Sequence, residues 1–248
     1  MPLMMNNDDS MQLVKTTSNY GFSAVKIDKL QASKYTLVTV VSDASGSVDA
    51  YAKELESCLK TIVSACQKSP MVDNLMMRLV QFNSGVNETH GFKLLADINP
   101  DDYNDSVHPA GQTALYDATY TAIEATRDYA KLMKAQDYLS NAIVFVLTDG
   151  CDNASTYGAK EIKKLIEKIK LEEVLETLTV VLVGVNSTDP SLTQILGDMQ
   201  KDAGITQFID IGTATPSKLA KLANFISQSV SSTSKAIMTG TVPPPLTF

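Results

Sequence analysis

Residues 35–47 read YTLVTVVSDASGS, and they join an apolar run to a cluster of oxygen-bearing side chains. The run at 35–41 is rich in β-branched and apolar residues, as a buried strand is. Directly after it, Asp43, Ser45 and Ser47 place a carboxylate and two hydroxyls at alternate positions. Hard oxygen ligands just past the carboxyl end of a strand are suited to a small dication. We therefore expect a strand here, with a candidate metal site at its tip.

Short β-rich segments alternate with longer amphipathic segments along the rest of the chain. The predicted strands are residues 35–42, 76–83, 92–97, 142–148, 178–185 and 207–211. Apolar residues at helical spacing predict helices over residues 48–68, 115–133, 162–169, 192–199 and 219–230. This alternation predicts an α/β fold with a doubly wound, mostly parallel six-stranded sheet and helices on both faces. The second and third strands are too close for a helical crossover, so they should form an antiparallel hairpin, which gives the sheet one antiparallel edge strand.

Composition divides the chain into a central domain and two flanking segments. The domain should span residues 35–230, where strands and helices alternate. Residues 1–34 are interpreted as an N-terminal arm in which 21–27 form either an extra edge strand or an extended segment. The Ser-, Thr- and Pro-rich residues 231–248 are interpreted as a linker or docking tail, with the three prolines at 243–245 extended.

The bulk composition excludes several classes of function. The chain has 248 residues, of which 44% are hydrophobic and 20% charged, with a net charge of −7. It has no run of Lys and Arg to follow phosphates, so we expect no nucleic-acid partner. It also has no apolar stretch near the roughly 20 residues that span a bilayer, and no basic region followed by an apolar core at the start. We therefore expect neither a membrane span nor a secretory signal.

The cysteine and histidine counts indicate the redox compartment of the protein and argue against a histidine-rich metal site. Cys58, Cys66 and Cys151 are an odd set without a CxxC pattern, which is typical of reduced thiols and predicts a cytoplasmic protein. His90 and His108 are too few for a histidine-rich zinc site.

Two later motifs offer further oxygen ligands. Thr113 ends the triplet GQT at 111–113, and Asp149 lies in TDG at 148–150, just after the predicted strand 142–148. In a doubly wound sheet these loops meet at the carboxyl ends of the strands. Asp43 and Asp149 would balance the charge of one dication, while three hydroxyls add ligands without charge. Such a set suits Mg²⁺ or Mn²⁺ and leaves coordination positions open.

Each residue of this set also has an ordinary structural interpretation. Asp43 and Ser45 are common turn formers after a strand. Ser47 could be the cap of the helix that follows and have no other role. Asp152 has two interpretations of equal weight. It either hydrogen-bonds metal-bound water or caps the next helix.

Taken together, the three motifs resemble the metal-ion-dependent adhesion site (MIDAS) of von Willebrand factor A-type domains. Asp43, Ser45 and Ser47 match the first motif of the family, Asp-x-Ser-x-Ser, and Thr113 and Asp149 match the residues of its second and third loops. The resemblance covers residues 35–230. It implies a binding module, not an enzyme, whose Mg²⁺ or Mn²⁺ bridges to an Asp or Glu of a partner protein. Intracellular members of this family imply an AAA+ ATPase or an assembly subunit as the partner.

Two other functions remain open from the sequence. The chain could be a structural component of a phage or bacterial assembly that uses its two terminal segments for contacts. It could also be a magnesium-dependent hydrolase, because haloacid-dehalogenase-like phosphatases begin their site with an aspartate after the first strand. Those enzymes have a second carboxylate two residues later, where this chain has Ser45, a poor proton shuttle.

Overall fold

The computed structural model describes residues 10–186, 189–241 and 248. The strands are β1 (Met11–Lys15), β2 (Gly21–Val25), β3 (Lys34–Asp43), β4 (Leu75–Phe82), β5 (Val86–Leu94), β6 (Leu139–Thr148), β7 (Leu178–Gly184) and β8 (Gln207–Asp210). The α-helices are α1 (Ala52–Cys66), α2 (Leu115–Lys134), α3 (Ala159–Glu172), α4 (Pro190–Asp202) and α5 (Pro216–Thr239). Within the described residues, none of these helices combines the length and the apolar character needed to cross a bilayer.

The strands form one mixed sheet in the order β1-β2-β5-β4-β3-β6-β7-β8. β3 lies at the centre and pairs in parallel with both β4 and β6, and the parallel part continues through β7 to β8. The parallel strands β3, β4 and β6 therefore end at the same edge of the sheet, where the predicted site residues lie.

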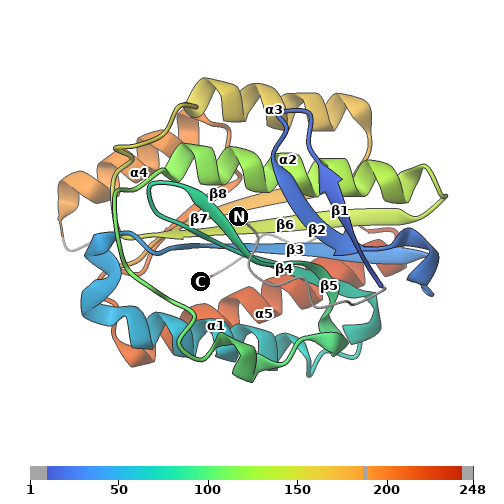
Figure 1. The fold of residues 1–248 in the computed structure, drawn as a ribbon, viewed down its shortest axis with the longest axis horizontal. Helices are drawn as coiled ribbons and strands as arrows, with labels where there is room; N and C mark the ends of the chain where they lie inside the picture. The colour runs from blue at the N-terminus through green and yellow to red at the C-terminus, as the bar shows by residue number, and fades with distance from the viewer. Residues whose placement is uncertain (1–9, 187–188, 242–247) are drawn as a thin grey trace.

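Helices cover both faces of the sheet, so the predicted α/β fold class is confirmed. Figure 1 shows α2, α3 and α4 on one side of the sheet and α1 and α5 on the other. Two buried apolar clusters match this division, one packed under α2, α3 and α4 and the other under α1 and α5. The central strands are buried along nearly their whole length, which explains the continuous apolar run of β6.

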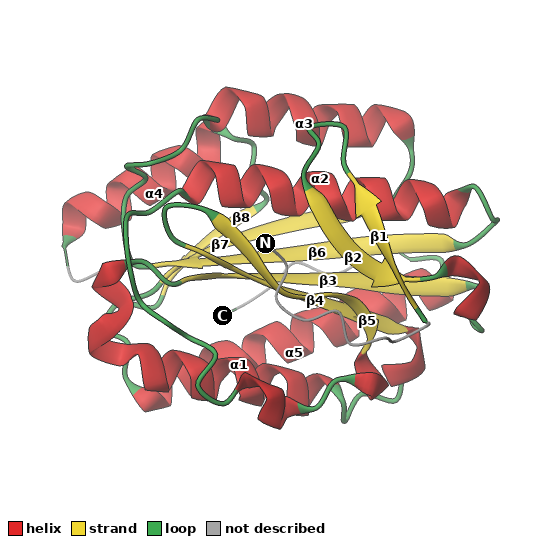
Figure 2. Cartoon of the chain, in the orientation of Figure 1, coloured by secondary structure: helices red, strands yellow, loops and turns green. Residues whose placement is uncertain are grey.

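The sheet has more strands than the six predicted, and its antiparallel strand is not at the edge. β5 is antiparallel to β4, as predicted, but it spans Val86–Leu94 and not 92–97. β2 lies outside β5 through a single parallel pair, Ala24 with Phe92. β1 then pairs antiparallel to β2 and forms the edge (Figure 2). The alternative of an extra strand over residues 21–27 is confirmed by β2, although β2 lies inside the sheet and not at its edge. β1 was not predicted, because its five residues show no strong alternation.

The interpretation of residues 231–248 as a linker is wrong for their first part, because α5 continues to Thr239. Small polar side chains let the helix lie close to the sheet. Ser229, Thr233 and Ser234 are all buried, and the Asn141 side chain of β6 donates a 2.7 Å hydrogen bond to the Thr233 carbonyl. The proline run at 243–245, like the polar residues 1–9, lies outside the described residues.

Candidate metal site

Asp43 ends β3 and is almost fully buried, with 2% of its surface exposed. Its Oδ1 accepts a 2.8 Å hydrogen bond from the Ser45 backbone N–H, which is the predicted turn contact. Its Oδ2 accepts a 2.7 Å hydrogen bond from the Thr148 hydroxyl at the end of β6. Burial raises the pKa of Asp43, the hydrogen bonds from Thr148 and Ser45 lower it, and the nearby charge of Asp149 raises it further. The net rise in pKa means that a negative charge is costly here without a cation.

The two serines link Asp43 to the second carboxylate. The hydroxyls of Ser45 and Ser47 lie 3.0 Å apart, and the Ser47 hydroxyl donates a 2.7 Å hydrogen bond to Oδ1 of Asp149. Ser47 lies inside a short 3-10 helix, Gly46–Tyr51, that precedes α1, and neither it nor Ser45 caps a helix through its side chain. The helix-cap interpretation of Ser47 is therefore wrong, and its hydroxyl points to Asp149 instead.

Backbone contacts bring Thr113 to the same edge of the sheet. The loop before α2 is attached to the Asp43 loop by hydrogen bonds from Gly46 N–H to the Gly111 carbonyl and from Ala110 N–H to the Ala44 carbonyl, at 3.2 and 3.0 Å. Gly111 has a φ of +74°, and a Cβ there would lie 2.6 Å from the Ser84 hydroxyl. Glycine is thus required for the loop to pass so close to the β4–β5 turn.

Thr113 also lies against the Asp149 loop. A Cβ built on Gly150 would be 3.6 Å from the Thr113 hydroxyl oxygen, so the small residue after Asp149 leaves room for that hydroxyl. The structure therefore gathers all five predicted ligands, from three distant segments of the chain. They are Asp43, Ser45, Ser47, Thr113 and Asp149.

The chemistry of this donor set fits a hard dication. Within the described residues, no Lys or Arg forms an ion pair with either carboxylate. The same part of the chain contains no group of three or more His, Cys, Asp and Glu side chains placed to hold a metal. The candidate site has two carboxylates and three hydroxyls, so it contains only two side chains of these kinds. Its five ligands are all oxygens, which Mg²⁺ and Mn²⁺ prefer.

Asp152 does not cap the next helix. Its carboxylate accepts hydrogen bonds from the Tyr116 N–H at 3.3 Å and from both the N–H and the hydroxyl of Ser155. Tyr116 is in the first turn of α2, so Asp152 caps the preceding helix across space. The next helix, α3, uses Glu161 instead, whose side chain accepts from the Gly158 N–H.

Three residues at this site were missed from the sequence. Thr148 binds Asp43, as described above, and Asn153 binds the backbone of Thr113 with both its side chain and its own N–H. Tyr51 is buried, and its pKa is raised above its ordinary range by burial, by the charge of Asp149 and by a hydrogen bond to that carboxylate. Only Thr148 carried a usable signal, because it directly precedes Asp149 at the end of a predicted strand.

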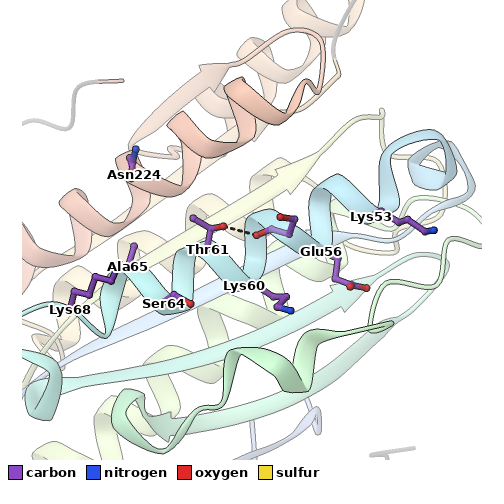
Figure 3. Close-up of a pocket in the computed structure, with 9 residues that line it drawn as sticks. Lys53, Glu56, Lys60, Thr61, Ser64, Ala65, Lys68 and Asn224 are labelled. Atoms are coloured by element: carbon purple, nitrogen blue, oxygen red, sulfur yellow. Dashed lines mark hydrogen bonds between the residues drawn. The ribbon is translucent and has the colours of Figure 1, made fainter.

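A separate hollow in the surface lies along α1 (Figure 3). This groove of about 450 Å³ is lined by Lys53, Lys60 and Lys68 and reaches Asn224 of α5. Lys60 already pairs with Asp101 at 3.1 Å and with Asn104 at 2.6 Å. None of the five gathered ligands lines the groove, so it is not part of the candidate metal site.

Comparison with known families identifies the fold. The family model of the von Willebrand factor type A domain matches residues 38–234. The chain belongs to this family. This von Willebrand factor type A domain can therefore be compared with solved structures of the same fold. No curated protein matches the sequence.

Solved structures from several organisms share the fold at low sequence identity. Proximal thread matrix protein 1 of the mussel byssus, solved with a zinc-occupied MIDAS motif, is 20% identical with a TM-score of 0.53, over 82% of this chain and 47% of that one. The PilB minor pilin of Streptococcus sanguinis is 15% identical with a TM-score of 0.59, over 84% and 64%. The vWF domain of the type V pili tip protein Mfa5 from Porphyromonas gingivalis is 12% identical with a TM-score of 0.55, over 88% and 99%. The chain thus spans about half of the mussel protein and nearly all of the Mfa5 domain.

Proposed function

We propose that this domain is a divalent-cation-dependent protein-binding module. The observation that carries the proposal is the gathering of two carboxylates and three hydroxyls at one edge of the sheet, with no basic side chain of the described residues paired to the carboxylates. Asp43, Ser45, Ser47, Thr113 and Asp149 would hold Mg²⁺ or Mn²⁺. When bound, the ion supplies an open position at which an Asp or Glu of a partner protein completes the coordination.

The donor set supports Mg²⁺ or Mn²⁺ over zinc, because all five groups are oxygens. The mussel protein with zinc in its MIDAS motif makes zinc the comparison to test. Thermal unfolding should therefore be followed with Mg²⁺, Mn²⁺, Zn²⁺ and a chelator. We expect Mg²⁺ and Mn²⁺ to raise the melting temperature, and Asp43→Ala to abolish the rise.

Asp49→Ala is the matched control for this experiment. Asp49 is an exposed acid in the same 3-10 helix, and within the described residues no hydrogen bond or ion pair joins it to the five ligands. It should leave the metal response as in the wild type. A wild-type protein whose melting temperature is the same in Mg²⁺, Mn²⁺ and chelator would refute the proposal.

The partner is proposed to be a subunit of a larger assembly. The names of two solved relatives, a minor pilin and a pilus tip protein, support this class over an AAA+ ATPase. Pull-down from the native host with Mg²⁺ or with chelator, using wild type and Asp149→Ala, tests the choice. A partner that is retained only by the wild type in Mg²⁺, and lost when one of its own acids is changed to the amide, would support it. Equal retention by both variants would count against it.

We propose a binding role without catalysis, in a reducing compartment such as the cytoplasm. Two residues after Asp43 the chain has Ser45, which is not an acid–base group at neutral pH. Cys58 and Cys66 are buried free thiols, and Cys151 is an exposed one. Turnover in a phosphatase screen would contradict the absence of catalysis. Recovery outside the cytoplasm on cell fractionation would contradict the reducing compartment.

A further inference from the structure

The loop that carries Asp149 also caps helix α2. The first turn of α2 has no capping side chain from its own N-cap residue, Ala114. Instead, the Tyr116 N–H donates to Asp152, and the Asp117 N–H donates to the Ser155 hydroxyl at 3.0 Å. In return, the Asp117 carboxylate accepts hydrogen bonds from two backbone N–H groups of the loop, at 2.9 and 2.7 Å. Loop and helix are thus joined over several residues by hydrogen bonds from backbone N–H groups of each to side-chain oxygens of the other.

Within this loop, Asn153 makes the contact with Thr113. The Thr113 N–H donates a 2.8 Å hydrogen bond to Oδ1 of Asn153. The Asn153 N–H donates a 3.0 Å hydrogen bond back to the Thr113 carbonyl. Both backbone polar groups of Thr113 are therefore satisfied by one residue of the opposite loop. Asn153 is four residues after Asp149, so it ties the second loop of the site to the third.

We propose that Asn153 is a positioning residue of the metal site, which sets the Thr113 hydroxyl relative to Asp149. The inference rests on the proposed function, because it assigns Asn153 a role toward the same ion. Asn153 acts through Thr113, whose backbone it fixes on both sides. Groups that orient metal ligands typically change metal affinity about 10- to 100-fold when they are removed.

Ser155 provides the matched control within the same loop. It lies two residues after Asn153 and also accepts a hydrogen bond from the α2 end, but from Asp117 and not from Thr113. Asn153→Ala removes the side-chain acceptor of the Thr113 N–H, whereas Ser155→Ala removes the acceptor of the Asp117 N–H together with the hydroxyl that donates to Asp152. If the loop only stabilises the fold, both variants should behave alike.

The experiment is calorimetric titration of Mn²⁺ into the metal-free full chain, together with urea unfolding in chelator. Asn153→Ala should bind Mn²⁺ at least 10-fold more weakly than the wild type, and Ser155→Ala should stay within about threefold of it. Asn153→Asp keeps the acceptor oxygen for the Thr113 N–H and should restore most of the affinity. Asn153→Gln, whose acceptor is displaced by one methylene group, should bind weakly, and it replaces the alanine variant if that variant does not fold.

The outcomes separate this inference from the proposed function. Equal losses of Mn²⁺ affinity in Asn153→Ala and Ser155→Ala, in step with their losses in urea, would overturn the positioning role alone. Wild-type affinity in both variants would also overturn it. No Mn²⁺ binding by the wild type would instead overturn the proposed function.

Discussion

Two nearly buried carboxylates, Glu88 and Asp43, have opposite surroundings in this fold. Glu88 of β5 has a side chain that is 10% exposed, and its Oε2 accepts a 2.7 Å hydrogen bond from the guanidinium of Arg78, which is fully buried. Its Oε1 accepts from both the N–H and the hydroxyl of Ser23 in β2. Asp43 has two hydrogen-bond donors and, among the described residues, no basic partner.

This difference separates a charge that the protein compensates internally from one that has no basic partner among the described residues. Arg78 compensates Glu88 inside the protein and lies against the rings of Tyr20, Phe22 and Phe92, so this cluster fixes the N-terminal hairpin to the sheet. A buried charge without a partner is costly. A bound dication would compensate Asp43 and Asp149 in the way that Arg78 compensates Glu88, and the predictions that follow test this contrast.

The largest expected effect comes from removing the internal cation. Arg78→Met leaves Glu88 with an uncompensated charge beneath the hairpin and should lower the free energy of unfolding by about 3–5 kcal/mol. Urea unfolding measures this loss. The double variant with Glu88→Gln should recover part of it. A loss below about 1 kcal/mol in the single variant would show that the pair is not a structural charge pair.

His90 gives the next largest effect, through pH. Burial, and then the charges of Lys93 and Arg78, lower the pKa of His90 to about 4, although a hydrogen bond to the Gly91 carbonyl opposes this. The unfolded chain, with an ordinary value of 6.5, binds the proton more tightly between these two pKa values. Stability should therefore be full above pH 6.5 and fall by up to about 3 kcal/mol as the pH is lowered to 4.

The control for this pH dependence is His90→Gln. This variant removes the titrating group, so its stability should change less between pH 6.5 and 4 than that of the wild type. Identical pH profiles for the two proteins would exclude His90 as the cause.

Metal binding at Asp43 should change the free energy of unfolding by a similar amount, but as a gain in stability and not as a loss. At a Mn²⁺ concentration 100 times the dissociation constant, the wild type should gain about 2.7 kcal/mol, and Asp43→Asn should gain nothing. In chelator, Asp43→Asn should be within about 1 kcal/mol of the wild type, because it removes an uncompensated buried charge. A loss in chelator as large as that of Arg78→Met would mean that Asp43 is a structural residue.

The smallest effect is expected at an exposed ion pair. Lys201 and Asp198 lie 3.7 Å apart in α4, with side chains 74% and 57% exposed. Lys201→Met should change the free energy of unfolding by less than about 0.5 kcal/mol in urea. A loss of unfolding free energy above about 1 kcal/mol would show that burial does not determine how much each charge contributes to stability.

The sequence predicted the central sheet and the five helices because their apolar periods are long and regular. It missed β1 and the interior place of β5, since a five-residue strand is too short to show a pattern. It also ended α5 too early. Ser and Thr are typical of linkers in sequence, but in a helix pressed against a sheet they provide the small surface that close packing needs.

The structure brings the three predicted motifs to one edge of the sheet, and their binding of a metal stays a prediction. Asp152 shows what a motif cannot predict. A carboxylate can cap any helix whose first turn is near it, and only the fold places α2, and not α3, beside it. Asn153 was missed for the same reason, because its importance depends on a contact 40 residues away along the chain.

The most direct test is a crystal structure of the protein with Mn²⁺, using the anomalous scattering of the metal. The account predicts one strong anomalous peak at the carboxyl edge of the sheet, within coordination distance of hydroxyl or carboxylate oxygens from all three loops. These are the loops of Asp43, Thr113 and Asp149. No peak at this edge in a Mn²⁺-saturated crystal, or a peak bound only elsewhere on the chain, would contradict it.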